Sequence, residues 1–209
     1  INATPLNRIG RVFAVDGSVD KTFNPGTGAD NYVNSIGLSL FVGEGDLPQE
    51  QLVITKYVIG GGFSSYNGQA RNGVARIEAD GTLDLEFDPG KGIEDGTVFA
   101  LHVQQGNQVL VVGEFTSVNG FKRNGIVRLL ENGEVDESFD IGAGPDGPIY
   151  TVTQMPDGRV VIGGSFSVIG DTPSSSLAVL QSNGQLDPTF EIGKGVLGEV
   201  YALDVVTQG

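Results

Sequence analysis

The chain of 209 residues contains 33 glycines, 9 prolines and no cysteine, and its formal net charge is −14. The lack of cysteine excludes disulfides, thiolate metal sites and a cysteine nucleophile. The acidic charge argues against nucleic acid as a partner, because phosphate binding depends on clusters of lysine and arginine, and without a run of 18 apolar residues the sequence predicts no membrane span.

Internal repeats organise the sequence. The related stretches "DGSVDKTFNPGTG", "DGTLDLEFDPGKG", "NGEVDESFDIGAG" and "NGQLDPTFEIGKG" begin at residues 16, 80, 132 and 183. Their Gly-x-Gly pairs begin at Gly26, Gly90, Gly142 and Gly193, so they are 64, 52 and 51 residues apart. The polar insertion "GEGDLPQEQ" at residues 43–51 accounts for the long first interval. The repeating unit is therefore about 51 residues long, a period that indicates a repeat architecture.

Each unit contains short runs rich in valine, isoleucine, leucine and aromatic residues, which predict β-strands. Four first strands are expected in the chain, among them residues 97–103, 148–154 and 199–205. Second strands are expected at 58–63, 109–115 and 160–166. Third strands are expected at 9–15, 73–79, 125–131 and 176–182. No segment has a sustained helical period, so helices should be nearly absent.

Turn residues give the strands an order. Asp-Gly and Asn-Gly pairs such as Asp80-Gly81 predict two-residue type I′ hairpins, because both positions tolerate positive φ. Each unit should therefore form about four antiparallel strands in meander order, as in a β-propeller blade. We predict an all-β propeller segment of about four blades in a single domain spanning residues 1–209. The expected units are 1–32, 33–96, 97–147, 148–198 and an incomplete 199–209.

The stretch "DGTLDLEFDPGKG" at 80–92 is interpreted as the last hairpin of a blade and the crossover to the next. Leu83 and Phe87 are expected to pack between blades, and Asp84 to accept backbone N–H bonds in the turn. Gly90 and Gly92 would let the chain bend sharply. Asp84 as a metal ligand is the alternative.

Arginines on the third strands predict an Arg–carboxylate pair inside each blade. Arg76 and Arg128 occupy equivalent positions, and Arg11 fits with a shift of one residue. Val179 stands at this position in the fourth unit, so the pair is expected to be dispensable.

The combined pattern is [DN]-G-x-[VL]-D-x-x-F-x-x-G-x-G, then V-[YF]-A-L, V-x-x-G-x-F and R-N-G-[IV]-x-R-[IL]. Over nearly the whole chain it resembles the delta-60 repeat, a β-propeller family. The resemblance implies a large secreted or surface protein of bacteria, or a component of a phage particle. No catalytic residues belong to the motif, so it implies none here. The Gly-Gly-x-Phe strand ends are also similar to kelch repeats, but the chain has no tryptophan.

The predicted strands do not divide into complete units, because the chain has four first strands and four third strands but only three second strands. We therefore expect the chain to be cut from a longer repeat array, with closure into a small four-bladed propeller as the alternative.

Few residues point to chemistry. His102 is the sole histidine and is expected on the surface or in the channel, and Ser174–Ser176 have no evident base partner. Carboxylate pairs such as Glu131/Glu134 fall at turns, where solvation is the expected role. No cofactor is predicted. Calcium is the alternative, with spaced oxygen ligands at Asp16, Asp20 and Asn24 and at Asp136 and Asp140.

These observations predict a non-enzymatic structural or protein-interaction module of a larger secreted, cell-surface or virion protein. Its partners would be other proteins, or further copies in a particle or surface structure. The expected contact residues are Tyr66 and Phe121 in loops and Asp46 and Glu50 in the insertion, although packing against the next blade is equally open for the aromatics. The rivals are a glycan-binding propeller, which needs exposed aromatics at matching places in several blades, and a polysaccharide hydrolase or lyase.

Overall fold

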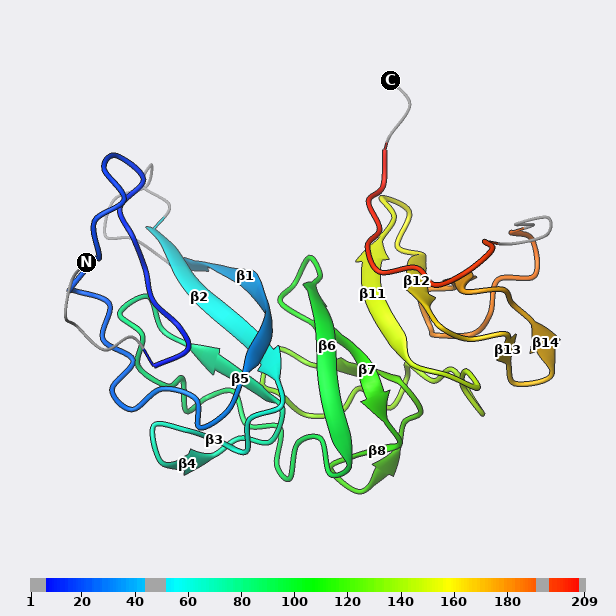
Figure 1. The fold of residues 1–209 in the computed structure, drawn as a ribbon, viewed down its shortest axis with the longest axis horizontal. Coiled ribbons are helices and arrows are strands. Elements are labelled where there is room, and N and C mark those ends of the chain that lie inside the picture. Colours follow the sequence, from blue (N-terminus) through cyan, green and yellow to red (C-terminus); the bar gives the residue numbers. More distant parts are fainter. Residues whose placement is uncertain (1–6, 44–51, 191–195, 207–209) are drawn as a thin grey trace.

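The architecture consists of strands, tight turns and crossovers. A computed structural model describes residues 7–43, 52–190 and 196–206, and Figure 1 shows their arrangement. No helix occurs in these three ranges, as expected from the lack of helical periodicity. It follows that no helix there could cross a membrane.

Three antiparallel sheets contain the long strands. Sheet 1 has the order β1 (Val33–Gly43), β2 (Leu52–Gly61), β5 (Val74–Ile77). Sheet 2 has the order β6 (Gly96–Val103), β7 (Val109–Phe115), β10 (Ile126–Leu129). Sheet 3 has the order β11 (Ile149–Gln154), β12 (Val160–Gly164), β15 (Leu177–Leu180). Each sheet is the predicted meander, in which the second strand of the unit is central.

A two-residue hairpin projects between the second and third strands of every sheet. The pairs are β3 (Ser65–Tyr66) with β4 (Gln69–Ala70), β8 (Ser117–Val118) with β9 (Phe121–Lys122), and β13 (Val168–Ile169) with β14 (Thr172–Pro173). These hairpins begin two residues after the Phe that ends each predicted second strand, at the sites predicted as polar loops.

The expected fourth strand is reduced to one bridge. The bridges join Ile77 to Leu83, Leu129 to Val135 and Leu180 to Leu186. Two other predicted strands do not form. Residues 9–15 contribute only the bridge from Val12 to Val19, and residues 199–205 are not in a strand. Three complete blades are thus described, with partial units before and after them, where about four blades were expected.

The turn prediction is correct at some sites and wrong at others. Asn67-Gly68 and Asn119-Gly120 both have positive φ and form two-residue turns, as type I′ requires. At Asp80-Gly81 only Gly81 has positive φ, and Glu78 N–H donates to Thr82 across a three-residue loop. This is a type I turn with a G1 bulge, which the Asp80 carboxylate stabilises by accepting the Thr82 N–H at 2.9 Å.

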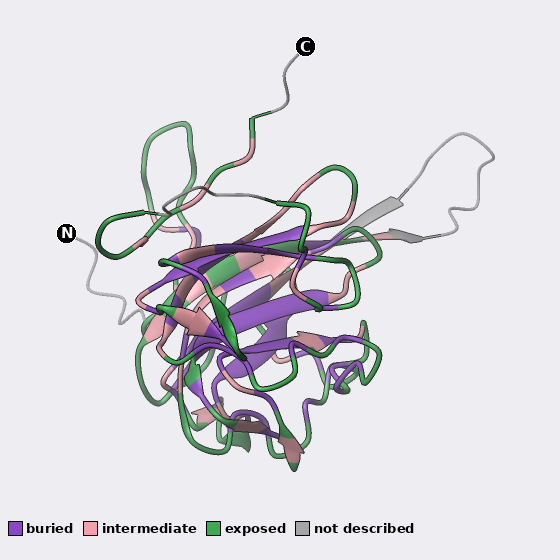
Figure 2. Cartoon of the chain, turned by 90° about the vertical axis from the view of Figure 1, so that its right-hand side faces the viewer, coloured by how far each residue is buried: buried purple, intermediate pink, exposed green. Residues whose placement is uncertain are grey.

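The core lies between the sheets. β6 contacts both β1 and β11, so the first strands of the three sheets lie next to one another (Figure 1). The central strand β7 is covered on both faces, since six of its seven residues are buried. Figure 2 shows buried residues on the strands and exposed ones in the turns. One apolar cluster joins Val58 of sheet 1 to Val111 of sheet 2, and a second joins Leu110 of sheet 2 to Ile162 of sheet 3.

Sheet 1 differs from the others at its far end. The pairing of β1 with β2 continues to Gly43 and Leu52, beyond the length of the other first and second strands. Most of the predicted insertion, residues 44–51, lies outside the described residues, so its role in contacts stays a prediction.

Candidate functional site

The repeated arginine and aspartate form the predicted pair. The Nε of each arginine donates to the aspartate Oδ2, at 2.8 Å for Arg11–Asp20, 2.5 Å for Arg76–Asp84 and 2.7 Å for Arg128–Asp136. Both side chains of the Arg76–Asp84 pair are almost fully buried. The shift of one residue at Arg11 has a simple cause, because its hairpin closes from Phe13 to Ser18 and therefore has one extra residue.

Each arginine also ties its own unit to the next. Its Nη1 donates to a backbone carbonyl in the next hairpin turn, at 2.6 Å for Arg11–Ala79, 2.6 Å for Arg76–Glu131 and 2.7 Å for Arg128–Ser182. Its guanidinium lies over the Phe of the Asp-x-x-Phe pair, at 5.3 Å for Phe23, 5.0 Å for Phe87 and 4.8 Å for Phe139. The repeated motif is therefore a joint between blades. Phe87 packs between sheets 1 and 2, and Leu83 packs in the cluster between sheet 1 and the preceding unit, so both lie between units as predicted.

The aspartates of the joint bind backbone as well as arginine. Asp84 Oδ1 accepts the Glu86 N–H at 3.0 Å, and Asp136 Oδ1 accepts the Ser138 N–H at 2.9 Å, as predicted for a turn staple. Burial raises the pKa of Asp84, but hydrogen bonds from Arg76 and Lys56 outweigh it and lower the pKa below its usual value. These carboxylates are ionised and fully engaged at neutral pH.

A second set of aspartates, the capping aspartates Asp30, Asp95 and Asp146, holds the crossovers against the hairpins. Asp146 Oδ1 accepts the N–H groups of Ser167 and Val168 at 2.7 and 3.0 Å, and Oδ2 accepts the Ser167 hydroxyl at 2.6 Å. Asp30 and Asp95 repeat these contacts. Hydroxyl hydrogen bonds lower the pKa of all three, that of Asp30 most.

The residues predicted to contact partners lie in different environments. Tyr66 is fully buried, and its hydroxyl donates to the Gly81 carbonyl at 2.7 Å. Burial raises the pKa of Tyr66 to about 12. The expectation of an exposed Tyr66 is wrong, and packing in the core is what the structure shows. Phe121 is partly buried against the cluster between sheets 1 and 2, under Arg123. Asp46 and Glu50 lie outside the described residues.

The other candidates do not come together. His102 is half-buried at the end of β6, and burial lowers its pKa. Of the calcium candidates, Asp20 and Asp136 bind arginine, while Asp16, Asn24 and Asp140 each accept a backbone N–H two residues on. No cluster of three metal-binding side chains occurs within the described ranges. Among Ser174–Ser176, the Ser174 hydroxyl donates to the Thr172 carbonyl.

Sequence reasoning missed a row of aromatic rings. Phe99, Tyr150 and Tyr201 are each 51 residues apart and occupy the same place in successive units. Tyr150 stacks on Tyr201 with centroids 4.9 Å apart, and Phe99 lies tilted 5.6 Å from Tyr150. Phe99 and Tyr150 are bulge residues on β6 and β11, which turns their side chains out of the sheet pattern. The V-[YF]-A-L motif around Phe99 and Tyr201, and the related sequence around Tyr150, carried the signal.

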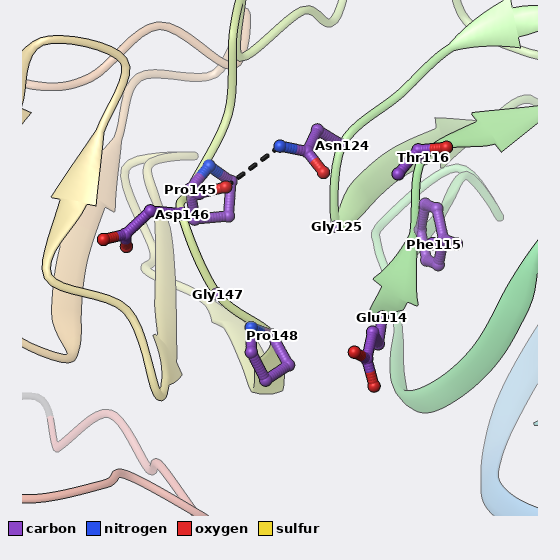
Figure 3. Close-up of a pocket in the computed structure, with 10 residues that line it drawn as sticks. Glu114, Phe115, Thr116, Asn124, Gly125, Pro145, Asp146, Gly147 and Pro148 are labelled. Carbon is purple, nitrogen blue, oxygen red and sulfur yellow. Dashed lines mark hydrogen bonds between the residues drawn. The ribbon is translucent and has the colours of Figure 1, made fainter.

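A pocket of about 390 Å³ lies between sheets 2 and 3 at the crossover (Figure 3). Asn124 is committed to the carbonyls of Ala143 and Pro145, and Asp146 points away from Glu114 toward the β13–β14 hairpin. Glu114 is exposed and makes no side-chain hydrogen bond or ion pair with any described residue. The pocket thus holds one uncommitted carboxylate.

The repeated three-stranded sheets and the Arg–Asp joints between them place the chain among all-β repeat proteins of the propeller type. Residues 56–87, 104–139 and 156–190 match a family model described as a domain of unknown function (DUF5122) beta-propeller. Each matched segment ends at the Phe of an Asp-x-x-Phe pair. The chain is therefore built from β-propeller repeats, and the predicted fold class is confirmed. No curated protein and no solved structure matches the chain in the corresponding comparisons.

Proposed function

We propose that the chain is a non-enzymatic β-propeller module of the delta-60 type, a rigid scaffold that binds protein partners within a larger secreted, cell-surface or virion protein. One observation carries this proposal: the repeated carboxylates are occupied by structural contacts, to arginine in the joints and to backbone N–H groups at the crossovers. Carboxylates engaged in this way hold the joints and crossovers in place and make the scaffold rigid. Recognition loops are typically positioned by a rigid scaffold of this kind.

The charge and surface support an interaction role. A net charge of −14 keeps the chain soluble and disfavours anionic partners. The exposed side of β1 carries an apolar row of Ile36, Leu38 and Leu40, each about half exposed. Apolar rows of this kind mark surfaces that other protein covers.

Photo-cross-linking tests this function. A photoreactive residue at Lys91 or Lys122, beside the crossover and the hairpin, should capture one defined protein on the cell surface or particle that contains the native polypeptide. The same group at Thr82, in the turn at the other end of the blade, serves as the control. Polysaccharide turnover that is lost on Glu114→Gln would contradict the proposal, as would a native polypeptide found only free in the cytosol.

Glycan binding is the second candidate, and the aromatic row favours it. Phe99, Tyr150 and Tyr201 are aromatics at matching places in successive units, and Tyr201 is 67% exposed. Aromatic faces combine a large apolar area with defined geometry, which suits the C–H faces of sugar rings. A glycan array tests this candidate, since a glycan-binding propeller should retain at least one neutral oligosaccharide.

A further inference from the structure

A polar pocket of about 500 Å³ lies between sheets 2 and 3, at the end of the blades away from the crossovers. Its lining comes from the end of β6, the turn after it and the turn between β11 and β12. The side chains that matter here are His102, Gln104, Gln105, Gln108, Gln154 and Met155. Its volume is within the range of small-ligand sites, which is about 300–1,000 Å³.

Gln104 is the unusual member of this pocket. The residue is only 7% exposed, and its Oε1 is buried without a hydrogen-bond partner among the described residues. An unpaired buried amide oxygen costs about 1–3 kcal/mol, so it is rarely retained without a use.

The fold does not require glutamine at this position. Gln104 N–H donates to Gln108 in the turn of sheet 2, and Met155 N–H donates to Arg159 in the equivalent turn of sheet 3, both at 2.8 Å. Met155 therefore occupies the place of Gln104 one blade later. Because the repeat accepts an apolar side chain at this position, the fold does not need the amide of Gln104. The amide places an oxygen there that has no hydrogen-bond partner among the described residues.

The remaining lining is polar and carries no free charge. Arg128 donates to the Asp136 carboxylate, the Ser138 hydroxyl and the Ser182 carbonyl, so its charge is matched and three of its five N–H donors are used. Gln154 uses its Nε2 on the Gly158 carbonyl at 3.2 Å, which leaves its oxygen as an acceptor. His102 has one donor and one acceptor nitrogen when neutral, the form that burial favours.

A comparable pocket of about 540 Å³ lies between sheets 1 and 2 and has different chemistry. It is lined by Arg76, Glu86 and Glu131, so ionised groups dominate. The pocket between sheets 1 and 2 therefore has two carboxylates, Glu86 and Glu131, in its lining, whereas the lining of the pocket between sheets 2 and 3 contains no carboxylate.

We propose that the pocket of His102, Gln104, Gln108 and Gln154 binds a neutral saccharide residue. Amides that combine donors and acceptors match the vicinal hydroxyls of a sugar. The Gln104 oxygen is buried, so a rotation of its amide toward the pocket would bring it to the hydroxyl donor that it lacks. Met155 and Pro156 give the pocket an apolar wall for the C–H face of the ring. The uncompensated acidic charge of the chain disfavours an anionic sugar. This inference rests on the glycan-binding candidate above.

The test uses an array of neutral oligosaccharides, followed by ¹⁵N NMR of the glutamine side chains with the retained sugar. We expect shifts of the Gln104, Gln108 and Gln154 amides. Gln104→Met should weaken binding at least about tenfold, while its urea midpoint stays equal to or above that of the native chain, because the buried oxygen is gone. Gln181→Met, at an exposed glutamine outside the pocket, is the matched control and should bind normally.

Two outcomes would overturn the inference in distinguishable ways. If a sugar binds but is insensitive to Gln104→Met and is lost on Tyr201→Ala, the glycan-binding function stands and the site lies on the aromatic row. If no neutral sugar binds, or if the pocket amides shift only with a peptide, both the saccharide site and the glycan-binding candidate fail.

Discussion

Arg159 donates its Nη1 to Asp187 Oδ2 at 3.1 Å in the one complete blade whose third strand has Val179 in place of an arginine. Lys56 and Gln108 occupy the position of Arg159 in the other sheets and reach the same oxygen of Asp84 and Asp136. The arginine partner has thus moved from the third strand to the start of the second. The exception at Val179 therefore does not leave this blade without an Arg–Asp pair, and the dispensability of the pair stays a prediction.

This exchange predicts compensation between two sites. Arg159→Gln should lower the free energy of unfolding only modestly, because Arg159 is partly exposed and water screens the pair. Adding Val179→Arg would recreate the Gln108/Arg128 arrangement of sheet 2 and should recover most of that loss. Urea denaturation of both single variants and the double variant measures the coupling. Simple additivity would contradict the proposed equivalence.

The buried pair in sheet 1 should matter more. Arg76→Met leaves Asp84 buried with Lys56 as its only cationic partner among the described residues and removes the hydrogen bond to the Glu131 carbonyl. We therefore expect a loss of about 3–5 kcal/mol in the free energy of unfolding. Lys91→Met breaks the exposed Lys91–Glu94 pair and should change stability by less than about 0.5 kcal/mol. Equal effects in the two variants would show that the joint does not stabilise the blade contact.

The crossover glycines can be tested by steric change. Gly92 has φ +64°, and a Cβ there would lie 2.3 Å from the Asn72 carbonyl oxygen, so Gly92→Ala combines backbone strain with a clash. Gly120 has φ +81° with open space around it, so Gly120→Ala should cost only the left-handed strain of about 1–2 kcal/mol. Thermal unfolding should rank Gly92→Ala well below Gly120→Ala. The reverse order would be incompatible with the close packing of the crossover.

Stability should fall in acid. The pKa values of Asp84, Asp136 and the capping aspartates are lower in the folded chain than the value of about 3.9 expected when unfolded. The unfolded chain therefore takes up protons first. The contribution of these groups is complete above about pH 5 and is lost as pH falls through the folded pKa values.

Urea midpoints measured between pH 7 and pH 2.5 test this. Asp146→Asn should lower stability at pH 7 and flatten the acid dependence, because the Ser167 and Val168 N–H groups then face an amide that does not titrate. Glu114→Gln, at an exposed carboxylate without a described partner, serves as the comparison. An acid profile that is unchanged by Asp146→Asn would contradict the structural role of the capping aspartates.

The sequence alone determined the repeat, the strand order and the identity of the joint, because alternating apolar runs and Gly-containing turns are local signals that recur with the period. It could not distinguish the turn at Asp80-Gly81 from that at Asn119-Gly120, since the pairing of the flanking strands decides which residues close a hairpin. It also could not place Tyr66 in the core, or show that Arg159 replaces the arginine lost at Val179. Those outcomes depend on contacts between residues far apart along the chain. The aromatic row and the Gln104 pocket likewise exist only because the blades are laid side by side in the tertiary structure.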